Sequence, residues 1–236
     1  MYPARMLSGP LRATRRLVQN LYAAGGLLLV LGLAVAVLGL WALAELSEEV
    51  LQGETLRMDE AALRALARYA SPARDLLALE ITSLGSGTAA LAITVIVSAL
   101  LALLGRRHYA LLLAAAVAGA WILSPILKAL FDRDRPQVVE WRTPYVGQAS
   151  YPSGHAMMGM VLYITLAYIL HRLGGRRWVS AVAITIAGLL VVLIGVSRVY
   201  LGVHYPSDVL AGFAVGFSWA MFCAAIAETI RARKAA

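Results

Sequence analysis

Polar and reactive side chains are scarce in this chain of 236 residues. Only 14% of the residues are charged and there is a single cysteine, whereas 61% are hydrophobic and the mean hydropathy is +0.75. One cysteine excludes an intramolecular disulfide and a cysteine-based metal site, so we expect Cys223 to be a small buried apolar residue. No internal repeat and no flexible linker is evident, which favours one domain over residues 1–236. The composition excludes an ordinary soluble domain and indicates an integral membrane protein.

Long apolar runs predict an all-α membrane bundle. A helix needs about 20 apolar residues to cross the hydrocarbon core of a bilayer. Six runs reach this length, so we expect six transmembrane helices, over roughly 22–44, 77–104, 109–130, 155–171, 178–197 and 206–228. Between the first two, residues 48–72 place Leu56, Leu63 and Leu66 at helical spacing, which predicts an amphipathic helix on the outer membrane interface. It is either a lid beside a site or a plain connector.

The formal net charge of +8 follows the membrane topology. Arginines gather in segment 1–21, around residues 105–107, in 172–177 and in the C-terminal tail, whereas the other connections hold nearly all the carboxylates. Basic connections remain in the cytoplasm, which predicts cytoplasmic termini and acidic connections that face the periplasm or exterior of the cell membrane. The positive charge therefore does not indicate nucleic acid. The first apolar run is longer than that of a signal peptide, so we expect it to be retained as a span.

The first polar cluster is a pair of cations at the end of an apolar run. Lys128 lies near the outer end of the run over 109–130, and Arg135 follows seven residues later. Pro136 biases Arg135 away from helical geometry, so we expect the helix to end between the two cations, which could then bind one anion. Taken alone, Lys128 is better explained as a side chain that extends to the membrane interface.

The second cluster, Tyr151-Pro152-Ser153-Gly154-His155, stands directly before an apolar run. Ser153 can serve as N-cap or phosphate ligand, and Gly154 lets the backbone approach an anion at the positive end of the helix dipole. His155 would then lie in the first helical turn, within reach of that anion. An ordinary helix start with an interfacial histidine fits these residues equally well until the third cluster is considered.

The third cluster joins the last two apolar runs. Pro206 suits the first turn of a helix, which places Asp208 in that turn and His204 just before it. The carboxylate can accept a hydrogen bond from one imidazole nitrogen and leave the other as a directed lone pair, as a nucleophilic histidine needs. Arg198 adds a planar donor for phosphate oxygens. A helix cap with a nearby histidine would explain His204 and Asp208 alone, but all three clusters fall on one predicted membrane face.

Together the clusters resemble the three signature motifs of the type 2 phosphatidic acid phosphatase superfamily, over roughly residues 77–228. The resemblance rests on Lys128 with Arg135-Pro136, on Pro152-Ser153-Gly154-His155, and on Ser197-Arg198 with His204 and Asp208. It implies that His204 attacks phosphorus, that Asp208 orients His204, and that His155 protonates the leaving oxygen. It further implies that the phosphate oxygens are bound by Lys128, Arg135, Ser153, Gly154 and Arg198. Three fixed cations can replace a metal ion in such chemistry, so we expect no metal and no cofactor.

The leading hypothesis is therefore a membrane lipid phosphatase that hydrolyses a phosphomonoester or pyrophosphate headgroup at the outer membrane face. Undecaprenyl pyrophosphate, phosphatidylglycerol phosphate and phosphatidic acid are the substrates that the resemblance implies. The alternative is a protein that binds or transports an anionic lipid without hydrolysis, which leaves the His204–Asp208 pair idle. A haloperoxidase is a remote third option, because those relatives are soluble. The expected partners are the lipid phosphate and the bilayer.

Two further expectations concern charge around the site. Arg133 and Arg142 either hold a second phosphate or are ordinary loop charges beside Asp132, Asp134 and Glu140. Asp208 favours the protonated form of His204, whereas the neighbouring cations favour the neutral form that attack requires. We therefore expect a bell-shaped pH–rate profile from His204 and His155.

Overall fold

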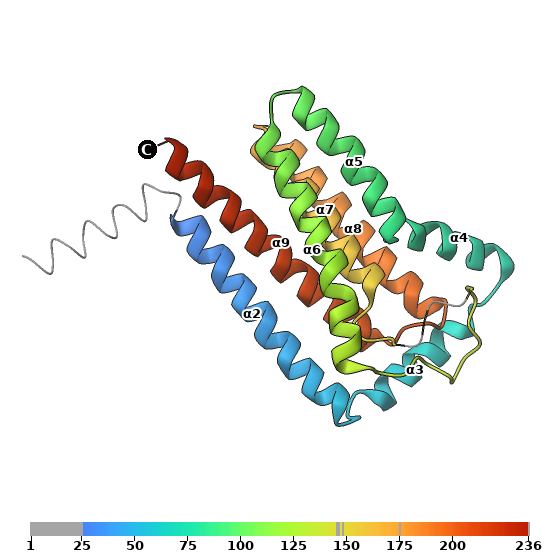
Figure 1. Ribbon diagram of the computed structural model, residues 1–236. Coiled ribbons are helices and arrows are strands. Elements are labelled where there is room, and N and C mark those ends of the chain that lie inside the picture. Colours follow the sequence, from blue (N-terminus) through green and yellow to red (C-terminus); the bar gives the residue numbers. More distant parts are fainter. Residues whose placement is uncertain (1–25, 145–146, 148, 175, 236) are drawn as a thin grey trace, which may run out of the picture.

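The computed structural model describes residues 26–235 except 145, 146, 148 and 175. This part of the chain is helical and contains no strand, which confirms the all-α prediction (Figure 1). The basic segment 1–21 lies outside the described residues. The helices are α2 (Gly26–Leu51), α3 (Leu56–Ala67), α4 (Pro72–Ser83), α5 (Gly87–Leu103), α6 (Arg107–Phe131), α7 (Gly154–Arg172), α8 (Arg177–Tyr200) and α9 (Pro206–Ala235).

Several helices are long and apolar enough to cross a membrane. Among the described residues these are α6, α7, α8 and α9, with α4 and α5 as a fifth candidate if the bent pair is one span. Large apolar side chains point outward from them, as at Leu111 on α6, which is 70% exposed. The chain is thus a multi-pass membrane protein. The count of six spans stays a prediction, since the first expected span, 22–44, begins outside the described residues.

The expected span over 77–104 is broken in the structure. The axes of α4 and α5 differ by 46°. Ser86 starts the second helix, because its hydroxyl accepts a hydrogen bond from the Ala89 N–H at 3.2 Å. A side chain at Gly85 would put a Cβ 2.6 Å from Ile194 Cγ2 and 2.9 Å from the His155 carbonyl oxygen. The break therefore lets this part of the chain lie against the first turn of α7.

Helix α3 is shorter than the helix expected over 48–72. Helix α2 continues to Leu51, and Gly53 turns the chain with a φ of 78° before α3 begins. Figure 1 shows α3 at the end of the bundle where α2 ends, and it packs on α8 and α9. Its buried residues are Asp59 and Leu63. The segment thus has one face fixed against the bundle, whereas its place at the membrane interface stays a prediction.

Close packing of α7 and α9 fixes the helix starts that carry the second and third clusters. Helix α7 packs on α6, α8 and α9. A Cβ at Gly212 would lie 2.6 Å from the Ser153 carbonyl oxygen, and one at Gly216 would lie 2.7 Å from that of Met157. Small residues allow such close approach of membrane helices. Both glycines therefore hold the first turns of α7 and α9 side by side.

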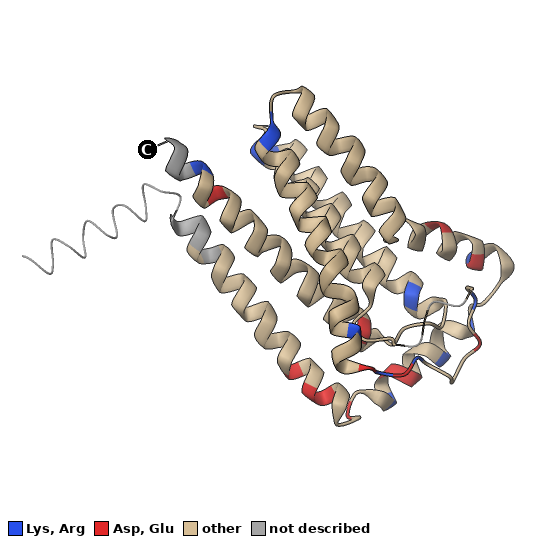
Figure 2. Ribbon diagram, in the orientation of Figure 1, with Lys and Arg blue, Asp and Glu red and all other residues tan. Residues whose placement is uncertain are grey.

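Acidic residues gather mainly at one end of the bundle. Figure 2 shows acidic residues at the end of α2 and on α3 and α4, where basic residues also lie, and basic residues at the α5–α6 turn at the opposite end. The three clusters lie at the end where α2 meets α3, in the connections between α6 and α7 and between α8 and α9. The end that holds the three clusters is therefore the acid-rich one, whereas basic residues occur at both ends.

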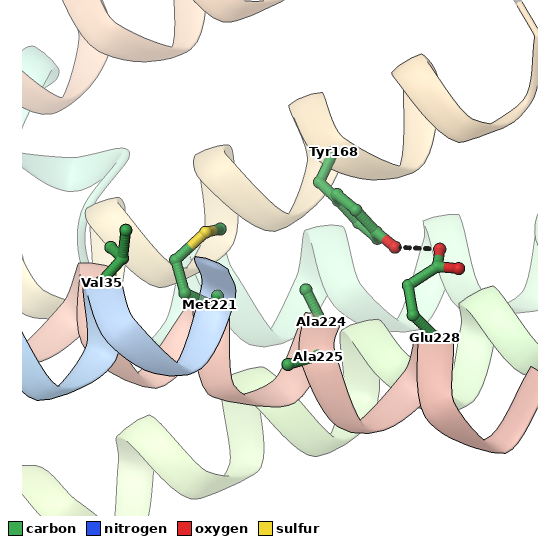
Figure 3. Close-up of a pocket in the computed structure, with 7 residues that line it drawn as sticks. Val35, Tyr168, Met221, Ala224, Ala225 and Glu228 are labelled. Carbon is green, nitrogen blue, oxygen red and sulfur yellow. Dashed lines mark hydrogen bonds between the residues drawn. The ribbon is translucent and has the colours of Figure 1, made fainter. Parts of the chain in front are cut away.

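A second charged cluster lies at the end of the bundle opposite the three motifs. Glu228 on α9 accepts a hydrogen bond from the Tyr168 hydroxyl on α7, beside a pocket of about 230 Å³ (Figure 3). Arg172 Nε lies 2.9 Å from Glu228 Oε1, and Arg231 Nη2 lies 2.9 Å from Glu228 Oε2. This cluster ties the ends of α7 and α9 together.

Candidate active site

The two cations of the first cluster flank the end of α6, as predicted. The Lys128 ammonium donates a hydrogen bond to the Ala149 carbonyl oxygen at 2.7 Å. The Arg135 guanidinium donates to the carbonyl oxygens of Gly147 and Val203, each at 2.6 Å. Backbone carbonyls orient a cation without cancelling its charge, so both residues can still attract an anion.

The second cluster forms the start of α7. Ser153 is the N-cap residue by position, yet its side chain makes no capping hydrogen bond, and its buried Oγ has no hydrogen-bond partner among the described residues. A Cβ at Gly154 would lie 3.1 Å from Ser124 Oγ and 3.9 Å from Lys128 Cε. The N–H groups in the first turn of a helix lack intrahelical partners. This helix start therefore offers anion donors next to Lys128.

His155 faces a pocket between helices. It lines a cavity of about 220 Å³ together with Trp121 and Ser124 on α6 and Gly87 at the start of α5. The imidazole also lies close enough to the first and third clusters to interact electrostatically with Arg198, His204, Lys128 and Arg135. His155 therefore stands between an opening and the group of cations.

The third cluster places His204 between an acid and a cation. His204 Nδ1 lies 3.4 Å from Asp208 Oδ2, and His204 Nε2 lies 3.3 Å from Arg135 Nη1. At the first distance Nδ1 faces the carboxylate but does not meet hydrogen-bond geometry. Arginine has only donors, so Nε2 is the acceptor in its contact, and the proton of a neutral ring is on Nδ1, towards Asp208.

The buried position of His204 decides its charge. Its side chain is 2% exposed. Burial lowers the pKa of His204 well below its ordinary value of 6.5, and Arg198, Arg135 and Lys128 lower it further. Burial and these cations therefore outweigh the raising effect of a backbone hydrogen bond at Ser150, which favours a neutral His204 at pH 7.

Arg198 reaches the site from the last turn of α8. It is 2% exposed, and its Nη1 donates a hydrogen bond to Thr82 Oγ1 at 3.1 Å. Arg198 Nε is buried without a hydrogen-bond partner among the described residues. Thr82 lies in α4, so the bent α4–α5 pair orients one of the three cations.

Arg133 does not have either of the roles considered for it. Its Nη1 lies 2.6 Å from Asp208 Oδ1, and its Nη2 lies 2.9 Å from Asp59 Oδ2. Asp59 is fully buried and was not singled out. The sequence did contain a sign of it, because Asp59 lies three residues after Leu56 and four before Leu63, on the apolar stripe of α3.

Arg142 is held away from the candidate phosphate cradle. Its Nη1 donates to the Tyr200 carbonyl oxygen at 2.6 Å, its guanidinium stacks 5.3 Å from the Tyr200 ring, and its Nε lies 3.9 Å from Asp75 Oδ1. These contacts fasten the connection between α6 and α7 to α4 and α8. They favour the interpretation of Arg142 as a structural loop charge.

Comparison with known proteins adds independent information. The family model described as PAP2 superfamily matches residues 109–232. The chain is 34% identical over 161 residues to phosphatidylglycerophosphatase B of Bacillus subtilis, which covers 67% of this chain and 77% of that protein. It is also 42% identical over 73 residues to an undecaprenyl-diphosphatase of Sulfolobus acidocaldarius, 31% of each chain.

The fold is similar to a solved structure as well. The crystal structure of a transmembrane PAP2 type phosphatidylglycerolphosphate phosphatase from Bacillus subtilis superposes with a TM-score of 0.78 and 28% identity, over 83% of this chain and 96% of that chain. The prediction of a hydrolase of the lipid phosphatase class is thereby confirmed. This chain therefore belongs to the PAP2 superfamily, the type 2 phosphatidic acid phosphatases whose three motifs its sequence resembles.

Proposed function

We propose that the protein hydrolyses the phosphate or pyrophosphate headgroup of a membrane lipid through a phosphohistidine at His204. One observation carries this proposal. The Nδ1 of His204 faces Asp208 and its Nε2 faces Arg135 in a group of cations, and burial and these cations lower the pKa of His204. A protein that only binds anionic lipids would need the cations, but it would not need a neutral, oriented imidazole among them.

The headgroup binds first. Lys128, Arg135 and Arg198 neutralise its nonbridging oxygens, as positioning and charge stabilisation in phosphoryl transfer require. Ser153 Oγ and Arg198 Nε are buried donors without partners among the described residues, so an incoming phosphate oxygen can accept from both. The N–H groups at the start of α7, including that of Gly154, complete the cradle.

His204 Nε2 then attacks phosphorus, and the bond from phosphorus to the leaving oxygen breaks. His155 in its protonated form gives a proton to that oxygen, so the leaving oxygen departs as a hydroxyl group and not as an oxyanion. Asp208 stabilises the positive charge that develops on the His204 ring, because its carboxylate faces Nδ1. The phosphoryl group remains covalently bound to Nε2.

Water completes the reaction. His155, now without its proton, accepts one from a water molecule as the water oxygen attacks phosphorus. The bond from Nε2 to phosphorus breaks, phosphate leaves, and His204 returns to its neutral form. The cations and the N–H groups at the start of α7 stabilise the charge on the phosphate in both steps. Among the described residues no group of three or more His, Cys, Asp or Glu side chains is arranged to hold a metal ion.

The substrates we propose are undecaprenyl pyrophosphate, phosphatidylglycerol phosphate and phosphatidic acid. Two relatives, a phosphatidylglycerophosphatase and an undecaprenyl-diphosphatase, support this range. Purified protein should release phosphate from at least one lipid of this panel. The His204→Ala variant should lose this activity and still bind the same lipid, whereas full turnover by the variant would contradict the mechanism.

We also propose that the site faces the periplasm or exterior, that six helices span the membrane, and that both termini are cytoplasmic. The support is the concentration of arginines in the connections at the opposite end, such as Arg176. With Cys223 replaced by alanine, an impermeant thiol reagent should label Thr143→Cys on intact cells. The matched control Arg176→Cys should react only after permeabilisation, and the reverse pattern would overturn the orientation.

A further inference from the structure

A buried carboxylate outside all three motifs is connected to the candidate nucleophile. Asp59 on α3 is 0% exposed. Its Oδ2 accepts hydrogen bonds from Arg133 Nη2 at 2.9 Å and from Ser207 Oγ at 2.5 Å, and its Oδ1 accepts from the Ser207 N–H at 3.0 Å. A buried charge is costly unless it is paired and hydrogen-bonded. These donors compensate Asp59 and fix its position.

Arg133 joins this carboxylate to a second one. Its Nη1 donates to Asp208 Oδ1 at 2.6 Å and to Ser207 Oγ at 2.7 Å, while Nη2 is on Asp59. The guanidinium also stacks 4.2 Å from the ring of Tyr205. The planar fork of arginine can hold two acceptors in a fixed relation, which the single ammonium of lysine cannot do.

The contacts of Asp208 show what this bridge achieves. Its Oδ1 is bound by Arg133, and its Oδ2 accepts the Tyr205 N–H at 2.8 Å and faces His204 Nδ1 at 3.4 Å. Rotation of the carboxylate away from Arg133 would also turn Oδ2 away from His204. The orientation of His204 therefore depends on the contact between Arg133 and Asp208, and Arg133 is in turn held by Asp59 on α3.

We propose that Asp59 and Arg133 are positioning residues that hold Asp208 in the orientation that His204 needs for attack. This inference rests on the proposed function of His204. It also gives α3 a task that is neither lid nor plain connector, because α3 carries the carboxylate that fixes Arg133. Ser207 lies between the two acids and binds both Asp59 and Arg133.

Three variants separate geometry from charge. In Arg133→Lys the charge stays but the fork is lost, so kcat should fall by about 10²-fold, the cost of misplacing a reacting group by about 1 Å, with KM nearly unchanged. In Arg133→Gln the cation is also lost. In Asp59→Asn the carboxylate that compensates Arg133 is lost and an amide N–H₂ group faces the donors of Ser207, so kcat should fall as well.

The pH profile distinguishes positioning from a purely structural role. His204 is faced by Arg198 on α8, Lys128 on α6, His155 on α7, Asp208 on α9 and Arg135 from the loop between α6 and α7. Loss of the Arg133 cation raises the pKa of His204, so the acidic limb of kcat/KM should move to higher pH in Arg133→Gln. It should move to lower pH in Asp59→Asn and stay in place in Arg133→Lys.

The chain offers a matched control in Arg142. Its side chain is 14% exposed against 13% for Arg133, it also stacks on a tyrosine, and it pairs with a different acid, Asp75. Arg142→Lys and Asp75→Asn should leave kcat and the acidic limb unchanged. If Asp59→Asn does not fold, the neutral pair Asp59→Asn/Arg133→Gln should fold and still show low kcat.

The experiment measures phosphate release by full-length protein in mixed micelles of the panel lipid that the wild type hydrolyses fastest, per folded protein in gel filtration. Positioning is supported if His204→Ala is inactive and the Arg133 and Asp59 variants fall below the Arg142 and Asp75 controls. It is overturned if His204→Ala is inactive but Arg133→Lys matches Arg142→Lys. Turnover by His204→Ala would instead remove the proposed function itself.

Discussion

Two charged clusters at opposite ends of the bundle differ in how their charge is balanced. At one end, Glu228 accepts a hydrogen bond from the Tyr168 hydroxyl (Figure 3) and is paired with Arg172 and Arg231. At the other end, Lys128 is oriented by a carbonyl oxygen and Arg198 by a hydroxyl, while the carboxylate of Asp208 is paired with Arg133. We call the first cluster balanced because each of its cations contacts a carboxylate, and the second unbalanced because Lys128 and Arg198 are oriented by neutral groups. Cations that share a carboxylate tie helices together, whereas cations oriented by neutral groups prepare a site for an anion.

The largest effect should come from a cation of the unbalanced cluster. Arg198→Met removes a donor aimed at the phosphate, so kcat/KM should fall by about 10³-fold, as when one donor to a developing oxyanion is removed. The thermal midpoint should not fall, because Arg198 repels Arg135 in the unliganded site. A variant that melts early but retains its kcat/KM would show that Arg198 is structural.

The next effect concerns the balanced cluster, where we expect a loss of stability without a loss of activity. Glu228→Gln leaves Arg172 and Arg231 without their carboxylate, and because these cations are 20% and 50% exposed the loss should cost about 1–3 kcal/mol of stability. The variant should melt at lower temperature, while its kcat/KM below the transition stays within about twofold of wild type. A large loss of kcat/KM with unchanged stability would mean that this end of the bundle also takes part in catalysis.

A smaller effect is expected when the Ser153 hydroxyl is removed from the unbalanced cluster. Ser153 Oγ is buried without a partner among the described residues, so Ser153→Ala removes an unsatisfied group. Because losing an unpaired buried hydroxyl is neutral or stabilising, the thermal midpoint should not fall, whereas the lost phosphate contact should lower kcat/KM by about tenfold. Gly154→Ala is less informative, since its Cβ would crowd Ser124. A destabilised Ser153→Ala with wild-type kcat/KM would make Ser153 a simple helix cap.

The last prediction concerns the pH at which the acidic limb of the kcat/KM profile lies. His204 must be neutral to attack, so on the acidic side activity falls when the pH drops below the pKa of His204. Burial and the cations Arg198, Arg135 and Lys128 lower that pKa, which places the acidic limb of the kcat/KM profile below pH 6.5. A pH series of initial rates measures this limb, and a limb above pH 6.5 would contradict the assigned charge of His204.

Much of the candidate site could be predicted because its contacts are local or carried by motifs. The end of α6 between Lys128 and Arg135, and the start of α9 at Pro206, follow from proline and cap preferences near each residue. The separation of four residues between His204, just before α9, and Asp208, in the first turn of α9, already places them near each other. Residues this close in sequence stay close in space whatever the tertiary packing of the chain.

Other parts depend on packing between distant segments. Asp59 and Arg133 are 74 residues apart, and their contact exists only because α3 folds back onto α8 and α9. The break between α4 and α5 depends on the close approach of Gly85 to Ile194 and His155. Hydropathy stays high across this break, so hydropathy alone predicts one continuous span there. The charge of His204 likewise depends on burial that only the assembled bundle provides.

Chemical trapping of the intermediate tests the central claim most directly. Wild-type protein quenched during turnover of a lipid labelled with ³²P on its terminal phosphate should carry label that is stable to alkali and labile to acid, as a phosphohistidine is. Peptide mapping should place that label on His204, and His204→Ala should carry none. Label on another residue, or equal label in His204→Ala, would contradict the account.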